Sequence, residues 1–207
     1  MIRLLADGSI ATGSLCVRRR YEADIRSLNS AIRSARLTSG VQSRLVGHLH
    51  TVELDLLGKS WTDIGRFRTC LLPLGKGHER LFELQAELWR ASGYPAFSAW
   101  APPAWDPLPL VAAPSPPGGE IDVHLMRGEY RAAAINFAHC GAATLRVALK
   151  LTDDDPHSAV LRNAVRLHDV LWTDTSQGEP VAAALPELVP GKEGYVVSKI
   201  PGMIHQV

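Results

Sequence analysis

Apolar residues recur at helical spacing through the first part of the chain. The stripe resumes in phase after Gly40, and another stripe around Leu84 ends at Gly93, a residue type common just past a helix end. Asp63 is placed to cap one further short helix. The spacing predicts an all-α segment of three or four helices. Its main stripe consists of Ile25, Leu28, Ile32, Ala35, Val41, Leu45, Leu49, Val52 and Leu56.

The apolar period changes to two from residue 120 onward. Ile121, Val123 and Leu125 alternate with polar residues, and turn-forming residues separate such runs at intervals of about eight to twelve residues. This pattern is typical of short antiparallel strands, so we predict a β-sandwich and an α+β chain overall. The last residues up to Val207 read as a strand that is still running, so we expect a truncated sandwich and a fragment. Similar alternation occurs in residues 133–137, 145–151, 165–172 and 195–197.

A proline-rich stretch lies between these two patterns. Eight of the 14 prolines fall between Pro95 and Pro117. Proline fixes φ and removes a backbone donor, which predicts an extended connector. The charge also changes across it, since the part before it has 14 basic and 9 acidic side chains and the part after it has 8 and 11. We therefore predict a helical segment, a connector and a sandwich, with the boundaries 1–94, 95–119 and 120–207.

Composition excludes several classes of function. Lys and Arg number 22 against 21 Asp and Glu, so no basic excess is available to neutralise phosphates and we expect no nucleic-acid partner. No apolar run reaches the length of about 18 residues that a membrane span needs, so we expect no membrane partner. Cys16, Cys70 and Cys140 lie far apart, which argues against a disulfide framework or a zinc site. We expect no cofactor, and the compartment stays open.

No group of residues has the spacing of a catalytic or metal site. His48 and His50 are two residues apart on a predicted helix, so their rings point about 200° apart and cannot share one metal ion. The acidic run 153–155 lacks the alternation of a calcium loop and is interpreted as a hairpin turn. The basic run 18–20 is interpreted as a solvated helix start. We therefore name no catalytic and no metal-binding residue.

Two tryptophans and one charged corner are the candidate interaction features. Trp100 and Trp105 lie in the proline-rich connector, where exposed indole rings can stack on sugars. The alternative is that these rings pin the connector onto a neighbouring domain. Arg127, Gly128 and Glu129 form a triplet that suits a tight structural corner with its opposite charges paired across the glycine.

Several short motifs in residues 97–207 carry a family resemblance. An R-G-E step lies within residues 125–133, an x-V-x-L strand lies within 145–149, and the aromatic-proline run 99–105 precedes both. Together with the ending 200–207, these motifs resemble the N-terminal β-sandwich of large glycoside-hydrolase-like proteins, the group around glycoside hydrolase family 123. The resemblance implies an accessory domain that packs on a catalytic (β/α) barrel, and it implies that the catalytic acids lie in that barrel.

The function we expect is that of an accessory N-terminal region of a glycoside-hydrolase-like protein. Its partner would be the catalytic barrel of the same parent chain, and this chain alone would not hydrolyse a sugar. Two alternatives stay open. One is a non-catalytic carbohydrate-binding module that uses Trp100 and Trp105, and the other is an assembly or scaffold protein that associates through its helices.

Overall fold

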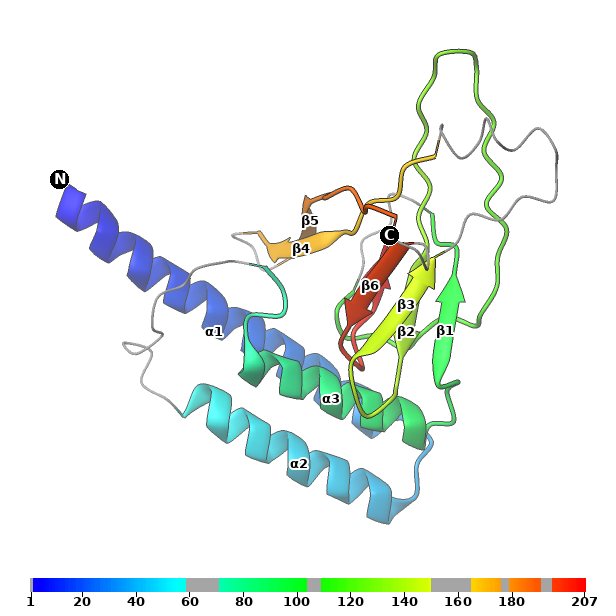
Figure 1. Ribbon diagram of the computed structural model, residues 1–207. Coiled ribbons are helices and arrows are strands. Elements are labelled where there is room, and N and C mark those ends of the chain that lie inside the picture. The colour runs from blue at the N-terminus through cyan, green and yellow to red at the C-terminus, as the bar shows by residue number, and fades with distance from the viewer. Residues whose placement is uncertain (1, 59–70, 104–108, 150–164, 176–178, 191–194) are drawn as a thin grey trace.

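The computed structural model shows three helices followed by short strands (Figure 1). It describes residues 2–58, 71–103, 109–149, 165–175, 179–190 and 195–207. The helices are α1 (Ile2–Ser34), α2 (Ser39–Leu57) and α3 (Lys76–Ala91). The strands are β1 (Phe97–Trp100), β2 (Asn136–His139), β3 (Leu145–Leu149), β4 (Leu171–Asp174), β5 (Pro180–Ala184), β6 (Tyr195–Lys199) and β7 (His205–Gln206). The predicted α+β class is confirmed, and the predicted helix after Asp63 lies outside the described residues.

The three helices bury their apolar stripes against one another. Leu28 and Ile32 of α1, Leu45 and Val52 of α2, and Leu84 of α3 are fully buried in one shared cluster. These residues recur every three or four positions, so each helix turns one apolar side toward the other two. Gly75 immediately precedes α3 and has a positive φ of 120°, a conformation that glycine adopts readily. The helical stripes predicted from the sequence are confirmed by this packing.

The described strands pair only in the antiparallel sense. β2 lies between β1 and β7, and all four of its residues are buried. β3 pairs with β6, and β4 pairs with β5, so the strands form three small sheets. The predicted β-sandwich is not confirmed by these pairings. β1 is a strand that the sequence analysis did not predict. It lies at a sheet edge, where Gly118 forms an isolated parallel bridge with Trp100 through backbone hydrogen bonds to Ala99 and Ala101.

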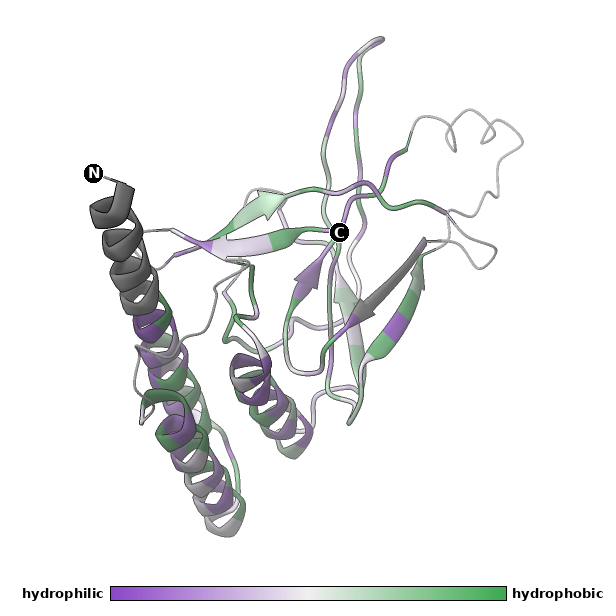
Figure 2. Cartoon of the chain, turned by 60° about the vertical axis from the view of Figure 1, so that its left-hand side comes forward, coloured by the Kyte–Doolittle hydropathy of each residue, from purple (hydrophilic) through white to green (hydrophobic). Residues whose placement is uncertain are grey.

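A second buried cluster joins α3 to the strands. Phe82 and Trp89 of α3 contact Leu110 of the connector and Met203 near the C-terminus. Figure 2 shows α3 between the α1–α2 pair and the strands. Gly202 has a φ of 73° and lies so close to α3 that an added Cβ would come within 1.7 Å of the Phe82 carbonyl oxygen. The last described residues are therefore packed into the core against a helix backbone.

Residues 119–135 form a long arm that projects from the body (Figure 1). At its tip the Glu129 N–H donates to the Met126 carbonyl at 3.0 Å, and Gly128 has the positive φ that a type II turn requires. The strand predicted around Val123 is wrong, since the arm has no ladder there. Alternation identified an extended backbone correctly, but a strand also needs a hydrogen-bonded neighbour.

Candidate functional site

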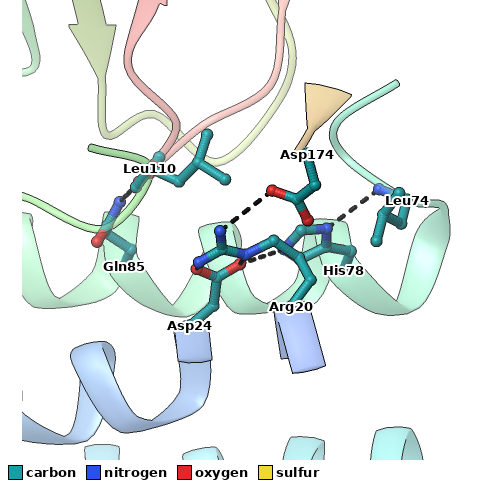
Figure 3. A network of polar contacts seen from close by, with 8 residues as sticks. Arg20, Asp24, Leu74, His78, Gln85, Leu110 and Asp174 are labelled. Carbon is teal, nitrogen blue, oxygen red and sulfur yellow. Dashed lines mark hydrogen bonds and ion pairs between the residues drawn. The ribbon is translucent and has the colours of Figure 1, made fainter. Parts of the chain in front are cut away.

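Four ionisable side chains form a buried network between α1, α3 and β4 (Figure 3). Arg20 contacts Asp24 at 2.5 Å through Nη2 and Asp174 at 3.2 Å through Nη1. His78 Nε2 lies 2.7 Å from Asp24 Oδ2. The Leu74 backbone N–H donates to His78 Nδ1 at 3.1 Å, so the ring proton of the neutral histidine lies on Nε2 and is donated to Asp24.

The geometry of this network favours a structural role. An Asp–His pair at this distance resembles the orienting half of a catalytic dyad. Here both ring nitrogens of His78 are used inside the protein, and its side chain is 0% exposed. A general base must reach the proton that it abstracts, and this ring reaches only protein atoms. The network therefore clamps two helices and a strand together.

Burial and charge shift the pKa values of two members of the network in the same direction. Burial lowers the pKa of Arg20, but Asp24 and Asp174 together hold it above its ordinary value. Burial raises the pKa of Asp174, and the neighbouring Arg20 guanidinium only partly offsets that effect. The interpretation of the run 18–20 as a solvated helix start is wrong, since α1 begins at Ile2 and the Arg20 side chain is buried and ion-paired. Its pairing with Asp24 at i+4 was visible in the sequence, whereas His78 had no local signal.

Trp100 lies at the end of β1, half-buried against the second core cluster. It also borders an open hollow of about 570 Å³ whose walls include Pro102, Pro116 and Gly118. The side-chain amide oxygen of Asn136 in this wall already accepts a hydrogen bond from Gln206 at 3.0 Å. The ring thus pins the connector to the body and also faces the hollow. Trp105, the second predicted binding residue, lies outside the described residues.

Apolar side chains are exposed along the arm. Tyr130 is 96% exposed, Met126 is 74% exposed and Leu125 is 58% exposed. Ile121 and Val123 are each 41% exposed. Adjacent exposed apolar residues of this kind mark surfaces that contact other molecules.

The charged triplet at the tip of the arm differs in one respect from the prediction. Gly128 forms a tight corner as expected. Glu129, however, makes its ion pair with Arg131 at 2.6 Å rather than with the arginine across the glycine. Its second carboxylate oxygen accepts the Met126 backbone N–H at 3.0 Å. Glu129 is therefore a structural residue of the turn.

An open cavity lies between the two sides of the arm. We call residues 120–125 the first limb and residues 130–134 the second limb. A cavity of about 470 Å³ lies between the limbs, with Pro102 and Pro103 at its base. Within the part of the chain that the structure describes, the turn bond at the tip is the only bond between two backbone groups in residues 120–134. Toward the described residues, both limbs therefore present backbone donors and acceptors without a backbone partner.

The described residues offer no candidate for a metal site or for a membrane span. No three of the described His, Cys, Asp and Glu side chains come together in an arrangement that could hold a metal ion. None of the described helices combines the length and the apolarity that crossing a bilayer requires. Comparisons with protein-family models, with curated proteins and with solved structures found no match for this chain.

Proposed function

We propose that this chain is a non-catalytic accessory module that docks onto another protein domain through its arm. The observation that carries the proposal is the exposure of Leu125, Met126 and Tyr130 at the tip of the arm. Burying apolar surface gains about 25 cal/mol per Å², so a partner that covers these side chains gains a substantial driving force. The arm projects from the body, so these side chains can meet a partner without disturbing either core cluster.

The proposed partner is the catalytic (β/α) barrel of a glycoside-hydrolase-like parent chain. Support comes from the resemblance of residues 97–207 to family 123-type proteins. The R-G-E motif of that resemblance occupies the tip of the arm, so residues that carry the likeness coincide with residues that are exposed. The proposal retains a β-sandwich for 120–207, and the antiparallel pairing of every described strand is consistent with that architecture.

The remaining side chains support a non-catalytic role for the chain itself. The Asp24–His78 pair is closed to substrates, and Glu129 is engaged in the turn. Hydrolysis of a glycosidic bond needs two carboxyl groups that flank the bond in an open cleft. In the proposed assembly these groups belong to the barrel.

Carbohydrate binding is a second candidate, and the hollow beside Trp100 favours it. Trp100 is half-buried and lines an open hollow, and an indole ring beside such a hollow can stack on a sugar ring. If this function is correct, Trp100→Ala abolishes retention of the chain on a polysaccharide resin. Equal retention of the variant and the wild-type chain contradicts it. Assembly through the helices has less support, because their predicted apolar stripes are buried inside the molecule.

Calorimetric titration with a separately expressed family 123-type barrel tests the proposed docking. The variant Leu125→Ser/Met126→Ser/Tyr130→Ser removes the exposed apolar tip, and we expect it to weaken binding by about tenfold or more. The matched control is Leu185→Ser/Val189→Ser, which removes two equally exposed apolar side chains elsewhere and should change binding by less than about twofold. Failure of the wild-type chain to bind, or equal binding by the tip variant, contradicts the proposal.

A further inference from the structure

We infer that the arm binds its partner by strand addition, with an extended segment of the partner inserted between the two limbs. This inference rests on the proposed function and specifies how the arm would bind. Extended backbone with unused N–H and C=O groups is the usual acceptor of an added strand. Each limb has such a backbone, and the cavity of about 470 Å³ separates them.

The residues around the cavity suit the close approach of another backbone. The second limb contributes the exposed residues Ala132 and Ala133, whose small methyl groups leave the main chain accessible. The two prolines at the base have no backbone N–H and leave the limbs as the main hydrogen-bonding walls. An inserted strand would bond to one limb along each of its edges and would convert the arm into a three-stranded sheet.

The first limb determines the chemistry of the inserted segment. Side chains alternate between the two faces of an extended chain, so Glu120 and Asp122 share one face while Ile121 and Val123 share the other. All four of these residues line the cavity. Cross-strand pairs of opposite charge and pairs of apolar side chains stabilise a sheet. The matching segment therefore alternates basic and apolar side chains.

The charges also argue against a second copy of the arm as the occupant. Pairing two first limbs would place the carboxylates of Glu120 and Asp122 from both copies in one sheet edge, and like charges opposite each other are destabilising. Positive charge near the cavity is already engaged, since Arg131 pairs with Glu129 at 2.6 Å. His124 lies 3.2 Å from Asp122, with both side chains exposed and open to exchange for a basic partner.

The test uses a fluorescein-labelled peptide of about seven residues that alternates Lys and Val, titrated with the full chain by fluorescence anisotropy. We expect this peptide to bind about tenfold more tightly than a peptide that alternates Glu and Val. The charge-reversed variant Glu120→Lys/Asp122→Lys should invert that preference. Equal binding of the two peptides, or an unchanged preference in the variant, overturns the inference.

Backbone methylation tests the insertion itself. A strand between two limbs bonds along both edges, so N-methylation of either alternate set of peptide residues should weaken binding by about tenfold. Binding that survives either methylation overturns insertion between the limbs. If the tip variant loses barrel binding but the chain binds the two peptides equally, the docking proposal stands and strand addition is rejected. If the peptide shows both the expected charge preference and the expected effect of N-methylation, but the chain does not bind the barrel, the proposed partner is rejected instead.

Discussion

The buried histidine of the last strand should make the protein less stable in mild acid. His205 lies in β7, where its Nε2 is 3.3 Å from the Ile200 carbonyl oxygen and its ring lies 5.7 Å from that of Phe137. Its pKa is lowered to about 3, mainly by burial and also by the charges of Lys199 and His139, while the hydrogen bond with the Ile200 carbonyl offsets part of the effect. Lys199 is itself ion-paired with Asp169 at 2.6 Å.

The sign of the effect follows from which state binds the proton. In the unfolded chain His205 binds a proton below its ordinary pKa of 6.5, whereas in the folded protein the ring stays neutral down to a pH of about 3. The stability contributed by the neutral ring is complete above pH 6.5 and is lost as the pH falls below that value. With about 1.4 kcal/mol per unit of pKa, the loss is about 2 kcal/mol at pH 5.

Urea unfolding followed by tryptophan fluorescence at about pH 7.5 and about pH 5 measures this loss. The variant His205→Gln keeps a neutral donor near the Ile200 carbonyl and removes the titrating group. We expect the free energy of unfolding of the wild-type chain to fall by about 2 kcal/mol more than that of the variant over this pH interval. Parallel pH dependence in the two proteins would refute the reasoning, because contributions from other groups cancel in the comparison.

Three further predictions concern the core and the arm. Asp24→Asn removes a carboxylate from the buried Arg20 guanidinium and should lower the free energy of unfolding by about 3 kcal/mol, as measured by urea titration. Arg18→Ala removes an exposed ion pair and should change that free energy by less than about 0.5 kcal/mol. Gly202→Ala places a methyl group against the α3 backbone at a positive φ and should lower the free energy of unfolding by about 3 kcal/mol in the same urea titration. Gly47→Ala adds a methyl group in open space on α2 and should instead raise the free energy of unfolding by about 0.5–1 kcal/mol. Gly128→Ala strains the turn of the arm, so it should weaken barrel binding while leaving the thermal midpoint within about 2 °C of that of the wild-type chain. A large drop in that midpoint would show that the arm belongs to the core.

The helices could be predicted because their signal is local. The spacing of Leu28, Ile32, Leu45 and Val52 reports a helical face directly, and these residues are buried. The burial of Arg20 could not be predicted, because it depends on Asp174, which is 154 residues away along the chain. The same holds for the contact between Asp24 and His78, which are separated by 54 residues.

The strands were harder to predict, because alternation does not reveal pairing. The alternation of Ile121 and Val123 predicted a strand, but the described structure provides no neighbour for that segment. Phe97 and Trp100 lie in a short stretch without proline, and β1 forms there through pairing with β2. The sequence thus predicted that the arm, the proposed docking site, is extended, but it did not predict that the arm is exposed.

Amide hydrogen exchange across residues 119–135 tests the proposed docking role most directly. In the free chain the amides of residues 120–125 and 130–134 should exchange rapidly, because these limbs have no backbone partners among the described residues, while those of β2 should be protected. Adding the family 123-type barrel should protect both limbs. Amides of the arm that are already protected in the free chain, or that remain unprotected while the barrel is bound, would contradict the proposed role of the arm.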